Sequence, residues 1–168
     1  MKPIPSNRIN RIQILIGTLC LLLGGMVYLV ARPPNQIYFV SKGLMPMSLY
    51  HFLPNIFRPA GHSLPSLIHV FSFILITAGI IGCEKRGCMI CCVSWFILDA
   101  AFELGQRFHA WPLRIIPGWF SGIPLLENTR NYFAYGTFDP FDLAAVAMGT
   151  LMAFWVLSIT IERRQPVL

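Results

Sequence analysis

Residues 92–108 read CVSWFILDAAFELGQRF, an apolar run that acquires polar side chains in its second half. Residues 92–98 are mostly apolar, and Asp99, Glu103 and Gln106 follow within about two helical turns. Positions four and seven residues apart lie on the same side of a helix, so the three polar groups share one face. The stretch predicts a membrane-spanning helix with an acidic face near one end.

The composition also favours a membrane protein. Of the 168 residues, 55% are hydrophobic and 12% are charged, with a mean hydropathy of +0.62. A soluble domain usually carries about 25% charged residues. The net charge of +6, from 13 basic and 7 acidic residues, is typical of Lys and Arg that flank membrane spans. No basic run with interleaved aromatic residues lies outside the apolar segments, so nucleic acid is not an expected partner.

Four apolar segments are long enough to cross a bilayer, which takes about 20 helical residues. They cover residues 12–31, 64–82, 88–106 and 141–161. The first follows a basic N-terminus, but it is too long for a signal peptide and lacks a small-residue cleavage site, so we expect a retained anchor. The predicted fold class is an all-α membrane protein, a bundle of four transmembrane helices in one domain over residues 1–168.

The distribution of basic residues predicts the orientation. Seven of them lie in three short flanks, before the first segment, between the second and third, and after the fourth: Lys2, Arg8, Arg11, Lys85, Arg86, Arg163 and Arg164. Six more are spread over two long connections, residues 32–63 and 107–140. The denser charge marks the cytoplasmic side, so we expect both termini inside the cell. The long connections are rich in aromatic residues, Pro and Gly, and are expected to be interfacial on the outer face.

This orientation places polar side chains from three segments at one depth. They are His69 in the second segment, Asp99, Glu103 and Gln106 in the third, and Asp139 and Asp142 at the start of the fourth. An ionisable side chain at the bilayer centre costs about 2.5–3.5 kcal/mol, so such residues are functional-site candidates by default. We expect a polar site in the outer leaflet, with Glu127 and Arg130 of the second long connection as contributors.

These residues resemble the VanZ-like family of small multi-span bacterial membrane proteins. The resemblance covers about residues 10–162 and rests on His69, on Glu103-x-x-Gln106 and on Asp142-x6-Gly149. It implies a multi-pass protein of the bacterial inner membrane, in a family with members associated with resistance to the glycopeptide teicoplanin. Two family features are missing, because residues 136–141 contain no Arg and Val146 stands where the family often has Asn. Arg130 is a candidate spatial substitute for that Arg.

Two functions fit these residues. In the first, the polar site binds or modifies an amphiphile, such as a lipid headgroup, a lipid-linked wall precursor or a lipophilic glycopeptide. His69, Asp99 and Glu103 would then bind the headgroup or transfer a proton. In the second, the protein is a non-catalytic membrane accessory or small permeation protein, and its buried polar residues hold the helices together. We assign no reaction to either, and the expected partners are membrane lipids.

Two further chemistries are less favoured by the residues. A metal site would need a second His at ligand spacing near His69, and none is present, so we expect no metal or cofactor. Ser66 lies one helical turn before His69, with Asp99 as a third member of a Ser-His-Asp arrangement. No nucleophile elbow surrounds Ser66, so a hydrogen bond that packs helices is its favoured role.

Small residues and cysteines carry two more expectations. Ala145, Gly149 and Ala153 form a small-residue stripe that predicts close helix packing and a homo-oligomer contact. Four of the five cysteines cluster at the turn between the second and third segments: Cys83, Cys88, Cys91 and Cys92. Because the cytoplasm is reducing, we expect free thiols there rather than a disulfide.

Overall fold

The computed structural model describes residues 9–33, 50, 63–124 and 126–162, which contain four long helices. These are α1 (Arg11–Ala31), α3 (Leu64–Ile81), α4 (Lys85–Arg107) and α7 (Pro140–Glu162). All four are long and apolar enough to cross a membrane, which confirms the four predicted spans to within three residues at each end. The described residues form helices and turns without strands, so the all-α prediction is also confirmed for them.

The side chains of the long helices are distributed as a bilayer requires. The core comes mainly from α3 and α7, where the following residues are at most 1% exposed: Val70, Ile74, Leu75, Ala78, Val146, Ala153 and Leu157. The outer faces expose large apolar side chains, for example Leu22 of α1, Ile97 of α4 and Leu151 of α7. An apolar belt of this extent suits lipid and would be unfavourable in water.

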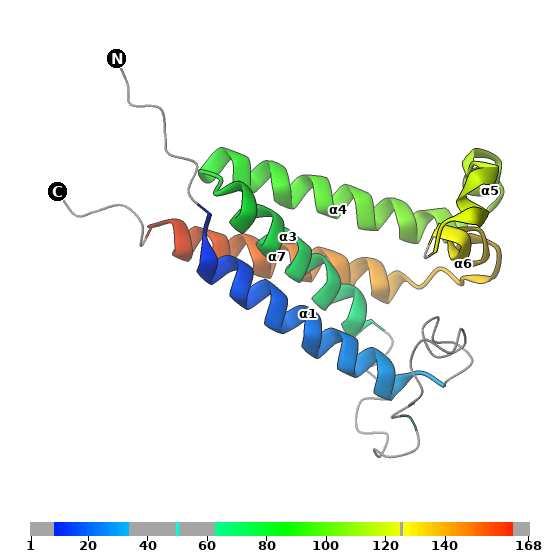
Figure 1. The fold of residues 1–168 in the computed structure, drawn as a ribbon, viewed down its shortest axis with the longest axis horizontal. Helices are drawn as coiled ribbons and strands as arrows, with labels where there is room; N and C mark the ends of the chain where they lie inside the picture. Colours follow the sequence, from blue (N-terminus) through cyan, green and yellow to red (C-terminus); the bar gives the residue numbers. More distant parts are fainter. Residues whose placement is uncertain (1–8, 34–49, 51–62, 125, 163–168) are drawn as a thin grey trace.

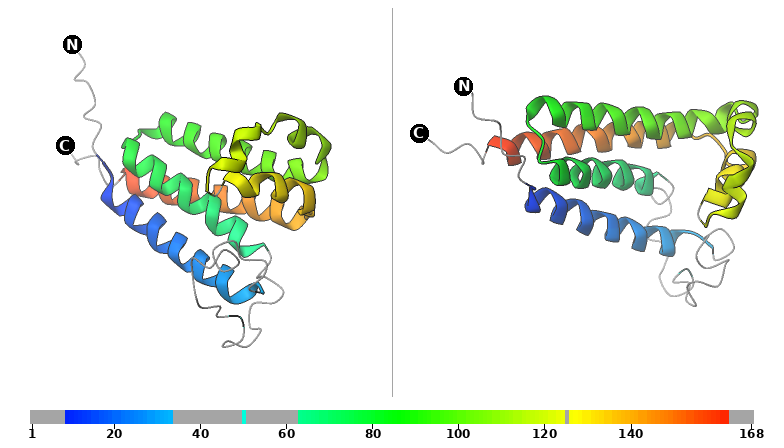
Figure 2. Two further views of the ribbon diagram at one scale, coloured as in Figure 1. Left: turned by 45° about the vertical axis from the view of Figure 1, so that its right-hand side comes forward. Right: turned by 45° about the horizontal axis from the view of Figure 1, so that its top comes forward.

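Helix α3 is at the centre of the bundle. It packs against α1 and α7, while α4 packs mainly against α7. Figure 1 shows α3 and α4 diverging from their shared turn, and Figure 2 gives two further views. The start of α1, the α3–α4 turn and the end of α7 lie together at what we call the turn end. The end of α4 and the start of α7 lie at the opposite end, the loop end.

Glycines let α1 and α3 approach closely. A Cβ on Gly17 would lie 2.8 Å from Ile76 Cγ1 and 2.9 Å from the Ser72 carbonyl oxygen. A Cβ on Gly24 would lie 2.6 Å from Ile68 Cγ2. Neither position has room for a side chain, so the two backbones meet directly. Helices in a bilayer associate through such van der Waals fit, because lipid is as apolar as their side chains.

Polar contacts fix the start of α1 at the turn end. Asn10 caps α1, because its side-chain oxygen accepts from Gln13 N at 3.4 Å. The backbone N–H of Asn10 donates to Gly79 O of α3 at 2.7 Å. Gln13, which is 2% exposed, donates through Nε2 to Thr160 Oγ1 of α7 at 2.8 Å. These bonds tie α1 to both of its neighbours.

The small residues of α7 face α3 within the same chain. A Cβ on Gly149 would lie 2.5 Å from the Leu67 carbonyl oxygen and 2.6 Å from Val70 Cγ1. Ala153 is fully buried in the same core, and Ala145 is partly buried. The stripe therefore serves packing within the chain, and the homo-oligomer contact through these residues stays a prediction.

The turn between α3 and α4 brings two cysteines together. Gly82 ends α3 with a left-handed φ of 63°, which a residue without a side chain adopts at little cost. The reversal places the Cα atoms of Cys83 and Cys88 5.6 Å apart, and their side chains form a disulfide. A Cβ on Gly87 would lie 2.8 Å from Cys83 Cβ, so Gly87 leaves room for the bridge.

The expectation of free thiols at this turn is therefore wrong for one pair. Cys91 and Cys92 are free and buried, as expected. Cys88 belongs to a CxxC pattern with Cys91, but its partner is Cys83. The reason is geometric, because Cys83 approaches across the turn, whereas Cys91 lies almost one helical turn further along α4.

Residues 108–139 form short elements beyond the end of α4. These are α5 (Ala110–Ile115), the 3-10 helices η2 (Gly118–Gly122) and η3 (Leu126–Asn128), and α6 (Thr129–Tyr135). Their expected position in the headgroup layer stays a prediction. The first long connection, residues 32–63, lies mostly outside the described residues, so the expectation for it is untested.

Neighbouring glycines of α1 give a direct test of the α1–α3 packing. Gly24→Leu should destabilise the bundle because the new side chain must displace Ile68, and overpacking of this kind costs about 1–3 kcal/mol. Gly25→Leu is the matched control, because no atom lies within 4 Å of a Cβ at Gly25. We expect a lower unfolding temperature in detergent for Gly24→Leu only. Equal stability of the two variants would contradict the packing.

Thiol counting tests the disulfide. Protein purified without reductant and then denatured should react with maleimide at three thiols, Cys20, Cys91 and Cys92, and at all five after reduction. Cys88→Ser should raise the unreduced count to four because Cys83 is released. Cys92→Ser, as a control, should lower it to two. Mass spectrometry of the labelled chain gives the counts, and five reactive thiols in the unreduced parent would rule out the bridge.

Candidate functional site

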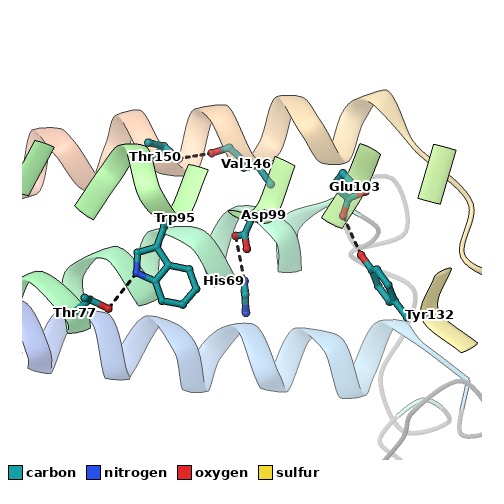
Figure 3. A network of polar contacts seen from close by, with 8 residues as sticks. All are labelled: His69, Thr77, Trp95, Asp99, Glu103, Tyr132, Val146 and Thr150. Atoms are coloured by element: carbon teal, nitrogen blue, oxygen red, sulfur yellow. Dashed lines mark hydrogen bonds and ion pairs between the residues drawn. The ribbon is translucent and has the colours of Figure 1, made fainter. Parts of the chain in front are cut away.

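The loop end collects polar side chains from three spanning helices. His69 lies in the second turn of α3, Asp99 and Glu103 lie in the last three turns of α4, and Asp142 lies in the first turn of α7. Figure 3 shows His69 facing Asp99 and Glu103 facing Tyr132 of α6. We call these five residues the polar cluster.

His69 joins α3 to α4 through Asp99. Its Nδ1 lies 3.3 Å from Asp99 Oδ2, and the His69 side chain is 49% exposed while that of Asp99 is 12% exposed. The imidazole also contacts the Phe73 ring, and Phe73 contacts Trp95. Trp95 Nε1 donates to Thr77 Oγ1 at 3.1 Å, which adds a second polar link between the two helices. The His69–Asp99 contact and the Trp95–Thr77 bond together join α3 and α4.

Glu103 is the buried acid of the cluster. The residue is 8% exposed, and its Oε1 accepts from the Tyr132 hydroxyl at 3.5 Å. Phe102 holds α6 in place, because its ring lies 5.9 Å from the Tyr132 ring and 5.5 Å from the Phe133 ring between centroids. Burial, followed by the nearby Glu103 carboxylate, raises the pKa of Tyr132. The phenol therefore stays protonated and remains able to donate.

Two carboxylate oxygens of the cluster have no donor. Glu103 Oε2 and Asp142 Oδ1 are both buried, and neither accepts a hydrogen bond from the described part of the chain. Asp142, Asp99 and Asp139 also interact electrostatically with Glu103, Asp142 most strongly. A buried acceptor without a donor costs about 1–3 kcal/mol. The cluster is thus rich in acceptors and short of donors, and a hydroxyl or ammonium group would complete it.

Two predicted site residues have structural roles. Asp139 caps α7, because its Oδ1 accepts from Phe141 N at 2.9 Å and Pro140 occupies the first helical position. Gln106 lies against Gly136 at the end of α6, where a Cβ on Gly136 would come within 2.8 Å of Gln106 Nε2. Neither residue needs a ligand to explain its position.

Other candidates from the sequence contribute less to the cluster. Arg130 is exposed on α6 and forms no ion pair with a described carboxylate, so the structure gives it no role as the missing family Arg. Glu127 lies partly buried in η3. Ser66 forms no hydrogen bond with His69, although both are described, so a Ser-His-Asp arrangement is incomplete. Across the described ranges, no three His, Cys, Asp or Glu side chains could share a metal ion.

Sequence reasoning missed Tyr132, the direct partner of Glu103. The two residues are 29 positions apart, and Tyr132 lies in a connection with many aromatic residues and no distinguishing spacing. The Trp95–Thr77 and Gln13–Thr160 contacts were also missed. The sequence contained a signal for these two contacts, because each joins polar groups that lie within apolar spans.

Comparison with known proteins adds no relative. No model of a protein family matches the chain. No curated protein and no solved structure matches it either. The VanZ-like resemblance therefore rests on the residues of this chain alone.

The Tyr132–Glu103 bond can be measured by a double-mutant cycle. Tyr132→Phe should lower the free energy of unfolding by about 0.5–1.5 kcal/mol, because Glu103 Oε1 loses its donor. The cycle with Glu103→Gln should give a coupling energy of similar size. Tyr135→Phe is the control, since Tyr135 is 82% exposed, and should have little effect. Additive effects of Tyr132→Phe and Glu103→Gln would contradict a direct bond.

Proposed function

We propose that this chain is a membrane protein that binds the polar headgroup of an amphiphile at its polar cluster. The headgroup would carry hydroxyl or ammonium donors, because the cluster offers carboxylate oxygens as acceptors. The candidates are a lipid headgroup, a lipid-linked wall precursor and a lipophilic glycopeptide. The proposal concerns binding, and assigns no reaction.

One observation carries the proposal: Glu103 Oε2 and Asp142 Oδ1 are buried at the same end of the bundle and receive no hydrogen bond from the residues that the structure describes. Buried polar groups normally have hydrogen-bond partners, so an unpaired one calls for an explanation. A ligand donor placed between α4 and α7 would satisfy both oxygens and reduce the repulsion between the two carboxylates. His69, which is half exposed, would then contact the part of the headgroup that remains near the surface.

The cellular setting forms part of the same proposal. The density of basic residues in the three short flanks of the spans favours the cytoplasm for both termini, which would put the polar cluster in the outer leaflet. A VanZ-like protein of the bacterial inner membrane would meet lipid-linked wall precursors and teicoplanin on that side. His69, Glu103, Gln106, Asp142 and Gly149 are the residues that support this placement.

A structural role is the second candidate, and it is favoured by two contacts. The His69–Asp99 and Tyr132–Glu103 bonds each join separate elements, as packing contacts would. In that case the protein is a non-catalytic accessory or small permeation protein. The two candidates differ in what neutralising Glu103 does to stability and to binding.

Amide substitutions separate the two functions. Glu103→Gln and Asp142→Asn keep the size of each side chain but replace an acceptor oxygen with a donor group. If a ligand supplies the donors, the affinity should fall about tenfold to hundredfold, since a hydrogen bond to a charged group contributes about 1.5–3 kcal/mol. Lipid extracts and teicoplanin susceptibility should change at matched protein levels. Thermal shift with teicoplanin or with the extracted lipids would measure binding directly.

Glu84→Gln is the matched control, because Glu84 is an exposed acid at the turn end. It should leave lipid profile, susceptibility and thermal shift unchanged. Loss of Glu103→Gln and Asp142→Asn from the membrane would instead favour the structural role. Unchanged binding with normal accumulation would contradict the proposal.

A further inference from the structure

A groove of about 770 Å³ lies beside the last turns of α4. Its walls come mainly from three helices: Phe102 and Gly105 of α4, with Phe108 directly after it, Trp111 and Ile115 of α5, and Phe133 of α6. At 100° per residue, Gly105 points about 200° away from Glu103, so the groove and the polar cluster occupy opposite faces of α4. The groove is therefore a separate feature of the loop end.

The lining of this groove is apolar. Thr129 is its most polar lining residue, and no charged side chain lines it. The volume falls within the range of about 300–1,000 Å³ that is usual for small-molecule sites. Gly105 lets α4 pack closely against two of the lining residues, because a Cβ there would lie 3.2 Å from Pro112 Cγ and still closer to the Phe133 ring. The shape and lining suit a hydrocarbon chain.

The groove continues a surface that faces lipid. Ile97, Leu98 and Phe102 of α4 are all more than 40% exposed, and Phe102 belongs both to this surface and to the groove. Phe102 lies within two turns of the end of the span, which is the depth where acyl chains meet headgroups. A chain from the surrounding bilayer could enter the groove without crossing a polar surface.

Three arginines are next to groove-lining residues in the sequence. Arg107 precedes Phe108, Arg114 precedes Ile115, and Arg130 follows Thr129, each next to a lining residue. All three are exposed, and none pairs with a carboxylate among the described residues. The acid between Arg114 and Arg130 in the sequence is Glu127, which lies partly buried in η3. Three exposed arginines, each next in sequence to a residue that lines the apolar groove, match an anionic headgroup attached to an acyl chain.

We propose that the groove binds one acyl chain of an anionic bilayer phospholipid, with the phosphate held by Arg114 and its neighbours. This site is independent of the headgroup site proposed for the polar cluster. Helix α6 connects them physically, because Tyr132 contacts Glu103 while Phe133 lines the groove. A lipid in the groove would support α6 from the side opposite Glu103.

Native mass spectrometry of the full chain in mild detergent tests the site. The probes are phosphatidylglycerol and phosphatidylcholine with identical acyl chains, titrated separately. One phosphatidylglycerol should bind more tightly than phosphatidylcholine, whose choline cation offsets the charge of its phosphate, by about fivefold for each arginine near the headgroup. Arg114→Gln should remove about that factor from the preference. Arg86→Gln at the turn end, an exposed control, should leave it unchanged.

A filled groove gives the second arm of the test. Ala101 lines the groove and is exposed, so Ala101→Trp should occupy the space and abolish retention of the lipid. Ala144→Trp, at an exposed position of α7 outside the groove, should retain it. Glu103→Gln should also retain it, which separates this site from the polar cluster. Lipid retention by Ala101→Trp equal to that of the parent, equal binding of the two lipids, or a dimer that excludes lipid would each overturn the proposal.

Discussion

The close fit of α3 between α1 and α7 is the constraint on which the rest of this structure depends. Burial from lipid gains little for an apolar side chain, so the spanning helices must fit one another to associate. Gly17 and Gly24 allow that fit on the α1 side, and Gly149 allows it on the α7 side. With those two sides of α3 occupied, its remaining face turns His69 toward α4 and Asp99. The position of the polar cluster thus follows from where the glycines lie.

Buried polar groups at the two ends of the bundle differ in whether they have hydrogen-bond partners, and this difference bears on function. At the turn end, Asn10 and Gln13 both have partners, and their bonds are explained by packing alone. At the loop end, Glu103 and Asp142 each keep a buried oxygen that accepts no hydrogen bond within the described part of the chain. A network selected only for packing would lose nothing by pairing or removing these oxygens, because unpaired buried acceptors cost free energy. Unpaired acceptors at the loop end are what we expect of a site whose hydrogen-bond donor comes from a bound ligand.

The sequence predicted what depends on local pattern and missed what depends on how the helices turn. The spans followed from apolar length, and the common depth of His69, Asp99 and Glu103 followed from helical rise. The bond to Tyr132 needed the path of the chain through α5 and α6, which no periodicity encodes. The small residues of α7 predicted close helix packing. Their spacing alone did not distinguish α3 from a second copy of the chain as the packing partner. The Cys83–Cys88 pair likewise required the left-handed turn at Gly82.

The turn end carries two features that favour opposite sides of the membrane. Lys85 and Arg86 favour the cytoplasm, whereas the adjacent disulfide is typical of oxidising compartments. The charges act on insertion itself, together with those at both termini. The bridge joins residues only five positions apart, so it restricts the unfolded chain less than a bridge across a long loop would. We therefore infer that the charges, rather than the disulfide, set the orientation. In that orientation the polar cluster would face outward, which is the side that the proposed headgroup site requires.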